Sequence, residues 1–432
     1  MKRKLINSFL ILSGSTLISK IFSILNRILL SRLLHEQGMA LYILVVPTLS
    51  LCITLAQFSV PSAVFRLVSN PRYQNKKVIL SGLMICFLTC IMIILSLFCF
   101  SYTISYQLLK NKDAYLPILS IIPFVPLVAL SGIIKNYYLG KEDVFSLSLA
   151  QFIEEVVRII VTYFLITFFK EFSLSILVSF AFLSMSAGEF CSICYLYFKH
   201  PRPILPNILV PYNKDNFILK DMMHIALPLT GSRLLHVFYN FIEPMILIHF
   251  LTRLSLSETY IQQEYAIING YVISLLLTPT FFNNVILRLL VPIFNKDIAY
   301  HQNKALQKHI LLGLLSSLCI SIPFTLLFYF YGDYCLLIMY NTKKGYTYLK
   351  YMSIPFTLFY LQTPLSAALQ CLNKNRVMFI LSVIEILIEL IFLFILIPIY
   401  HVASVAIVVL LGLLSTLLSS FYFVYKYVFS MQ

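Results

Sequence analysis

One stretch near the amino terminus decides the fold: SFLILSGSTLISKIFSILNRILLSRL, residues 8–33. It is apolar and long enough to cross a bilayer as a helix, yet it carries Lys20 and Arg27 well inside it. Seven residues are almost two helical turns, so the two cations lie on one face. A Lys or Arg near the bilayer centre costs about 3 kcal/mol, and such residues therefore usually face a partner or a water-filled cavity. The stretch predicts a polar, positively charged pocket within a membrane.

The composition of the whole chain is that of a membrane protein. Hydrophobic residues make up 60% of the 432 residues, charged residues make up 11%, and the mean hydropathy is +0.89. A soluble globular domain has about 25% charged residues. We therefore expect an all-α polytopic membrane protein. The net charge of +15 does not indicate nucleic-acid binding, because no basic cluster belongs to a soluble domain large enough to present it.

Hydrophobic runs separated by short charged turns predict about twelve transmembrane helices. The predicted spans begin near residues 8, 39, 78, 115, 145, 172, 222, 264, 307, 347, 376 and 402. The first run is too long and too charged for a signal peptide, so we expect it to stay as the first span. Loops on the side of the amino terminus hold most of the Lys and Arg residues, with Lys135 counted among them. The positive-inside rule then predicts both termini in the cytoplasm.

The chain divides into two similar halves. A proline-rich, charged segment, residues 199–221, lies near the midpoint and predicts a cytoplasmic linker. It separates an N-terminal six-helix lobe, residues 1–198, from a C-terminal six-helix lobe, residues 222–432. Ile122-Pro-Phe corresponds to Ile354-Pro-Phe in the second half, and Glu154 corresponds to Glu385. Parallel repeats of this kind are typical of transporters in which two pseudo-symmetric lobes rock around a central cavity.

A second polar stripe lies on the predicted seventh span, the counterpart of the first. Its polar residues follow one another at steps of three, four and three, which places them on one helical face. The second and eighth spans repeat the theme. The residues predicted to bind substrate are Lys20, Arg27, Arg66, Arg233, His236, Asn240, Glu243, Asn284 and Arg288. For Arg66 and Arg288, anchoring at the inner membrane surface is an equally good interpretation.

Other charges within the predicted spans favour a structural interpretation. Glu154, Glu155 and Arg158 are three and four residues apart, so an ion pair within one helix can offset the cost of burial. For Glu189, as for the carboxylates of the eleventh span, the spacing leaves open hydrogen bonding between helices and proton transfer. The nine cysteines lie almost all in apolar segments, and we interpret them as small core residues.

Several stretches spread over nearly the whole chain carry a family resemblance. They are Lys20 to Arg27 with residues 32–42, Phe58-Ser-Val-Pro61, Gln151 to Arg158, Ala226 to Arg233 with Glu243-Pro244, Thr278 to Asn284 with Leu290-Val-Pro292, Leu361 to Pro364, and Leu372-Asn-Lys374. In this order they resemble the polysaccharide exporter and stage V sporulation protein B branch of the MOP flippase superfamily, which is related to the bacterial lipid II flippase. The chain departs from that pattern in having about twelve spans where many relatives have fourteen, and Ser59 where a glycine is usual.

The resemblance implies a flippase in the bacterial plasma membrane. Its cargo would be an undecaprenyl-pyrophosphate-linked saccharide, with a peptidoglycan precursor such as lipid II favoured, moved from the inner to the outer leaflet by alternating access. Another lipid-linked repeat unit, of capsule, teichoic acid or O-antigen type, is the alternative. A multidrug cation antiporter is less favoured, because it would need carboxylates where Lys20 and Arg27 stand.

A membrane glycosyltransferase is also disfavoured, because the predicted outer loops are too short to carry a catalytic site. The sequence has no glycine-rich nucleotide-binding loop. We therefore expect neither an enzyme nor a bound nucleotide, cofactor or metal. Besides the lipid-linked substrate, the expected partners are membrane lipids and the cell-wall synthesis enzymes that make or use such a substrate.

Overall fold

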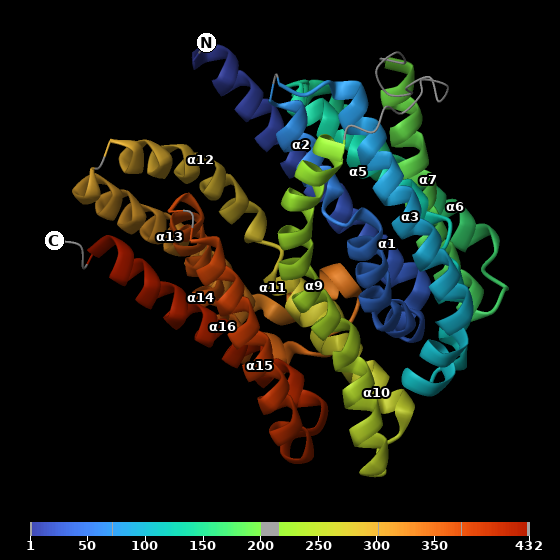
Figure 1. Cartoon of the computed structure of the whole chain (residues 1–432). Helices are drawn as coiled ribbons and strands as arrows, with labels where there is room; N and C mark the ends of the chain where they lie inside the picture. The colour runs from blue at the N-terminus through green and yellow to red at the C-terminus, as the bar shows by residue number, and fades with distance from the viewer. Residues whose placement is uncertain (1, 71, 200–215, 301, 373, 430–432) are drawn as a thin grey trace. The chain divides into compact units, whose positions relative to one another are not determined.

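The computed structural model describes residues 2–70, 72–199, 216–300, 302–372 and 374–429, without the side chains of residues 2–13, 15, 16, 216, 284, 285, 287–289 and 375. All the regular structure in these ranges is helical, and short turns connect the helices (Figure 1). The chain forms two compact units, Met1–Met245 and Ile246–Gln432. The all-α architecture predicted from the composition is thereby confirmed.

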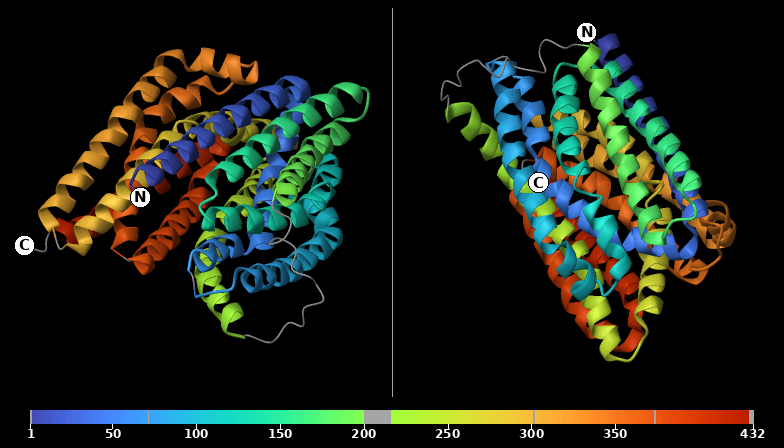
Figure 2. Two further views of the ribbon diagram at one scale, coloured as in Figure 1. Left: turned by 90° about the horizontal axis from the view of Figure 1, so that it is seen from above. Right: turned by 90° about the vertical axis from the view of Figure 1, so that its right-hand side faces the viewer.

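Among the described residues, the first unit contains seven α-helices and most of an eighth. Their bounds are α1 Lys2–Gln57, α2 Val60–Val68, α3 Asn75–Tyr102, α4 Tyr115–Leu119, α5 Phe124–Gly140, α6 Val144–Phe168, α7 Leu174–Lys199 and α9 Asn216–Arg253. Helix α6 packs along both α7 and α1, and α5 packs against α2, α3 and α7. Figure 2 shows these helices from two further directions.

Helix α1 contains the stretch that opens the sequence and continues beyond it. At about 1.5 Å per residue, its 56 residues are far longer than a hydrocarbon layer of about 30 Å. The backbone leaves the helical conformation at His35, where φ is 54° and ψ is −172°. The bend separates the two spans that the sequence predicts, one ending at Leu33 and the next beginning near Met39.

A tight break follows between α1 and α2. Phe58 and Ser59 both have positive φ, 44° and 49°, and Ser59 is the residue from which α2 begins. This left-handed conformation costs a residue with a side chain about 1–2 kcal/mol. The break therefore gives a physical reason for the glycine that the family resemblance leads us to expect at position 59.

Replacing Ser59 with glycine is expected to raise the stability of the protein by about 1 kcal/mol, because glycine adopts positive φ without strain. Ser59 is buried, and its Oγ has no hydrogen-bond partner among the described residues, so the change leaves no group unsatisfied. The apparent unfolding temperature of the purified protein measures the effect. Ser62→Gly, inside helical α2, is the control and should lower that temperature. A Ser59→Gly protein less stable than the parent would contradict this explanation.

The spans agree with the predicted number of about twelve. Six helical runs among the described residues are long and apolar enough to cross a membrane, and two of them, residues 17–68 and 376–429, have 52 and 54 residues, enough for two crossings each. A bent pair, Lys112–Leu119 with Phe124–Gly140, adds another. Helices α6, α12 and α14 bring the number to about twelve. Helix α6 carries three charged residues, which are paired as described below.

In the part of the second unit that the structure describes, the end of α9 is followed by seven further α-helices. They are α10 Glu258–Tyr265, α11 Ser274–Leu276, α12 Thr280–Ala299, α13 Asn303–Tyr340, α14 Tyr346–Cys371, α15 Asn375–Tyr400 and α16 Ser404–Val424. Helix α14 packs against α12, α13 and α16. Buried Phe294, Ile310 and Leu369 form part of the core that these helices share.

The predicted lobes, residues 1–198 and 222–432, stay a prediction. The linker between them lies mostly outside the described residues. Within the described part of the chain, residues 217–245 of α9 belong to the first compact unit. One of the contacts that hold them there is a hydrogen bond of 2.7 Å, donated by the Tyr73 hydroxyl to the carboxylate of Asp221.

Candidate functional site

Lys20 and Arg27 are the two predicted site residues that the structure brings together. Both side chains are half-buried on α1. Lys20 lies close enough to Arg27 and to Glu155 of α6 to interact electrostatically with each. The packing of α1 along α6 produces this arrangement. The cations of the first helix therefore face charged residues of a neighbouring helix in the same unit.

Five charged side chains from α5, α6 and α7 form ion pairs at this level of the first unit. Lys135 Nζ lies 2.5 Å from Glu154 Oε2 and 2.8 Å from Glu189 Oε2. Arg158 binds Glu154 Oε1 through Nη2 at 2.5 Å and Glu155 Oε2 through Nη1 at 3.2 Å. All five side chains are between 9% and 16% exposed, so water replaces few of these contacts. We call these five residues, together with Lys20, the charge cluster.

The charge cluster confirms one interpretation and corrects another. The predicted ion pairs of Glu154 and Glu155 with Arg158 are present, and Glu189 bonds to a residue of another helix. The assignment of Lys135 to an inner loop is wrong, because Lys135 lies inside α5 with a side chain only 13% exposed. The sequence does contain a signal for this role. Glu189 has no cation within one turn of its own helix, Glu154 and Glu155 share the single cation Arg158, and Lys135 stands within an apolar helical run.

The charges of the cluster balance one another, and Arg27 lies close to Lys20. In their ionised forms, the three carboxylates of the charge cluster are matched by Lys20, Lys135 and Arg158. Arg27 interacts electrostatically with Lys20, which holds two cations together on α1. The arrangement can therefore attract an anionic group to the α1 cations, while Lys135 and Arg158 remain committed to carboxylates.

The helices that carry the charge cluster approach one another closely at Gly188 of α7. A Cβ atom at this position would lie 2.7 Å from the backbone oxygen of Glu154 and 3.4 Å from its Cγ. A Cβ never comes so close to a backbone atom without a shift of the chain. The absence of a side chain at Gly188 thus permits the distance at which Lys135 reaches both carboxylates.

Gly188→Ala is expected to lower the stability by roughly 1–2 kcal/mol, since overpacking costs about 1–3 kcal/mol and alanine recovers part of this through its higher helix propensity. The apparent unfolding temperature measures the change. Gly231→Ala on α9 is the matched control, because a Cβ there would meet nothing within 4 Å, and this variant should be at least as stable as the parent. Equal unfolding temperatures for the two variants would rule out a packing role for Gly188.

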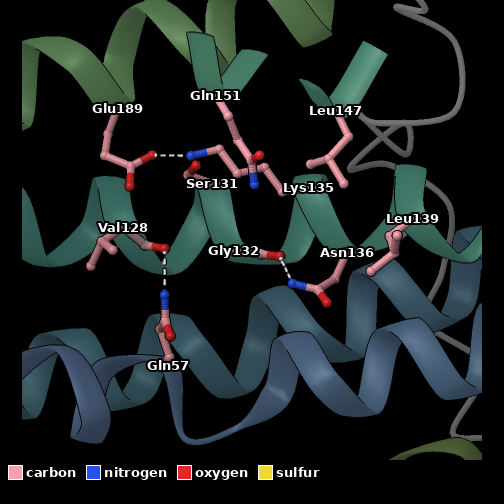
Figure 3. A pocket seen from close by; sticks show the side chains of 10 residues that line it. All are labelled: Gln57, Val128, Ser131, Gly132, Lys135, Asn136, Leu139, Leu147, Gln151 and Glu189. Atoms are coloured by element: carbon pink, nitrogen blue, oxygen red, sulfur yellow. Dashed lines mark hydrogen bonds and ion pairs between the residues drawn. The ribbon is translucent and has the colours of Figure 1, made fainter. Parts of the chain in front are cut away.

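A polar cavity of about 260 Å³ borders the charge cluster (Figure 3). Its lining residues are Gln57, Val128, Ser131, Gly132, Lys135, Asn136, Leu139, Leu147, Gln151 and Glu189. The amide of Gln57 donates to the backbone oxygen of Val128 at 3.1 Å, and the amide of Asn136 donates to that of Gly132 at 2.9 Å. Gln151 Oε1 is buried with no hydrogen-bond partner among the described residues. Because its two charged residues bind each other, the cavity is suited to water or neutral polar groups rather than to an anion.

The other predicted site residues have varied surroundings. Arg66, Arg233 and Asn240 are exposed, and His236 is half-buried. Glu243 is 4% exposed, and its Oε1 has no hydrogen-bond partner among the described residues. The proximity of this second group to Lys20 and Arg27 stays a prediction.

Two predicted residues, Asn284 and Arg288, lie on α12, with side chains outside the described residues. The preceding residue, Asn283, is buried, and its amide donates a hydrogen bond of 3.2 Å to the backbone oxygen of Tyr360. This contact between α12 and α14 could not be predicted from the sequence, because the two residues are 77 positions apart.

The sequence matches a known protein family over most of its length. The sequence model for polysaccharide biosynthesis proteins matches residues 5–298. Stage V sporulation protein B of Bacillus subtilis (strain 168) is 29% identical over 386 residues, which cover 86% of this chain and 74% of that protein. Sporulation protein YkvU of the same organism is 22% identical over 373 residues, covering 85% and 82% of the two chains.

The fold is similar to those of solved transporters. An inward-facing multidrug resistance MATE family transporter of the MOP superfamily has a TM-score of 0.76 at 14% identity, with 95% of each chain covered. A MOP superfamily transporter from Pyrococcus furiosus, described as having a binding pocket of reversed polarity, has a TM-score of 0.63 at 13% identity, with 99% of this chain and 96% of that chain covered. The chain therefore belongs to the family of polysaccharide biosynthesis proteins and has the fold of the MOP superfamily transporters.

Proposed function

We propose that this protein is a flippase that moves a lipid-linked saccharide from the inner to the outer leaflet of the bacterial plasma membrane by alternating access. Family membership and the transporter fold support the class of function. The observation that carries the proposal is that Lys20 and Arg27, both half-buried on one face of a membrane span, lie close enough to interact, which holds two cations together inside that span. In this proposal both termini lie in the cytoplasm.

An anionic pyrophosphate is the cargo chemistry that suits this site. A phosphate that leaves water needs charged donors to replace its hydration, and Lys and Arg supply short, charge-assisted hydrogen bonds. The polyprenyl tail can stay in the hydrocarbon layer, so the protein need not enclose it. A peptidoglycan precursor such as lipid II is our favoured cargo, because the relatives named above are sporulation proteins.

The second candidate cargo is another lipid-linked repeat unit, of capsule, teichoic acid or O-antigen type. The pyrophosphate is common to both candidates, so the α1 cations suit either. Export of cationic drugs is disfavoured even though the multidrug transporters share the fold. Lys20 and Arg27 would repel a cation, and every carboxylate of the charge cluster already lies close to a cation. We propose no catalytic activity.

The test is to express the chain in a strain depleted of its lipid II flippase and to measure the accumulation of lipid II in the outer leaflet. Rescue of growth together with outer-leaflet lipid II would support a peptidoglycan precursor as the cargo. Failure of a chain shown to be present in the membrane would rule out lipid II as cargo in that strain. Strains deficient in the export of a capsule or teichoic-acid precursor would then test the second candidate in the same way.

A further inference from the structure

A second cavity of the first unit lies away from the charge cluster. Its volume is about 400 Å³, and it is formed where the loop before α3 meets the beginning of α9. The lining residues are Arg72, Tyr73, Gln74, Lys77, Phe217 and Ile218. We call this cavity the α3–α9 groove.

The walls of the α3–α9 groove are held in place by specific contacts. The Tyr73 hydroxyl donates to Asp221 Oδ2 at 2.7 Å, and the Tyr73 ring stacks on Phe217 with centroids 6.5 Å apart. The hydrogen bond to Asp221 raises the pKa of Tyr73, so the phenol keeps the proton that it donates. On the other side of Tyr73, the loop is fixed by a hydrogen bond of 3.1 Å from the Arg72 backbone N–H to the side-chain oxygen of Asn70. These contacts hold the residues on the two walls of the groove in place.

One wall of the groove, at the start of α3, is positively charged, and the opposite wall, at the start of α9, is apolar. Arg72 and Lys77 supply two cations to the described lining, and the Asp221 carboxylate next to it is bound by the Tyr73 hydroxyl. Phe217 is 68% exposed, whereas Ile218 is buried. A ligand that satisfies both walls has an anionic head and an apolar body.

The position of the groove along the chain corresponds to the headgroup level of a membrane. The long apolar run of α3 begins at Val78, directly after Lys77, and the apolar run of α9 begins at Met222, shortly after Ile218. Both walls therefore stand at the ends of spans, on the face that the charge bias predicts to be cytoplasmic. Basic pockets between transmembrane helices on that face are suited to acidic lipid headgroups.

We propose that the α3–α9 groove binds the phosphate headgroup of an anionic phospholipid, with Arg72 and Lys77 on the phosphate and an acyl chain along Phe217. Arginine is well matched to this ligand because its planar guanidinium can bind two phosphate oxygens at once. A bound lipid would bridge the loop before α3 and the start of α9, two segments already joined by Tyr73 and Asp221. The site is distinct from the α1 cations, and the proposal does not depend on what the protein transports.

The test uses the full chain in phosphatidylcholine nanodiscs, titrated with phosphatidylglycerol and analysed by native mass spectrometry for bound lipid. The double variant Arg72→Gln/Lys77→Gln is compared with Lys76→Gln/Lys141→Gln, which removes the same charge from exposed lysines outside the groove. A hydrogen bond to a charged group contributes about a tenfold or larger gain in affinity, so we expect the groove variant, which loses two such contacts to the phosphate, to bind phosphatidylglycerol at least about tenfold more weakly than the parent. The control variant should bind like the parent.

Three results would overturn the proposal. The first is equal weakening of lipid binding in both double variants, which would indicate a general surface effect. The second is the absence of saturable binding of phosphatidylglycerol to the parent. The third is binding of soluble glycerol 1-phosphate as tight as that of phosphatidylglycerol, which would make the groove a site for soluble phosphate. Because the readout is lipid binding, a failure here leaves the proposed transport untouched, and a failure of the rescue experiment leaves this proposal untouched.

Discussion

Replacing Lys135 with methionine is expected to lower the stability of the protein by about 3–5 kcal/mol, the cost of leaving buried charges without their partner. The methionine fills a similar volume but removes the ammonium group that lies between Glu154 and Glu189. Arg158 still binds Glu154, so Glu189 is the carboxylate that loses most. The apparent unfolding temperature and the yield of folded protein in the membrane measure the change.

Two further variants make this prediction specific. Lys141→Met changes an exposed lysine just beyond the end of α5, and we expect a change within about 0.5 kcal/mol. Adding Glu189→Gln to Lys135→Met removes the stranded charge and should recover part of the lost stability. If Lys135→Met unfolded at the same temperature as Lys141→Met, the ion pairs of the charge cluster would contribute nothing to stability.

The second large effect is expected on transport. Lys20→Gln should slow the appearance of lipid-linked saccharide in the outer leaflet by roughly 10- to 100-fold, because a hydrogen bond to a charged group is worth about 1.5–3 kcal/mol. Glutamine keeps most of the length of the side chain and its ability to donate a hydrogen bond, so the loss reports the charge. The rate per copy of protein in the membrane is the quantity to compare.

The matched control is Arg32→Gln, which removes an exposed cation from the same helix. We expect it to transport at the rate of the parent, and Lys20→Arg to keep most of the activity because the charge is retained. A Lys20→Gln protein as active as the parent would remove Lys20 from the proposed site without affecting the choice of cargo.

The sequence predicted the fold well because hydrophobic runs and their turns are local properties of the chain. The ion pairs within α6 could be predicted for the same reason, because residues a few positions apart on a helix are neighbours whatever surrounds them. The partners of Glu189 could not be predicted. The residue that binds it, Lys135, lies 54 positions earlier in the sequence, and only the packing of α5 against α7 brings the two together.

The backbone conformation of Ser59 is a second feature that could not be predicted from the sequence. Its sequence surroundings predict a helix, and nothing in one sequence indicates that its backbone has positive φ. The same holds for the α3–α9 groove, because Tyr73 and Asp221 are separated by 148 positions. Positions defined by tertiary packing need either a structure or a comparison of related sequences.

The balance of charge in the cluster has an electrical consequence. Moving one elementary charge through a potential of 100 mV requires about 2.3 kcal/mol, but a group of residues whose charges cancel can move through the membrane field at almost no electrical cost. The cluster can therefore travel with its helices when the protein changes shape, without making that motion strongly sensitive to voltage. Voltage dependence of transport would then report the protein charges outside the cluster and the charge of the bound cargo, and these two contributions could be separated by comparing currents with and without substrate.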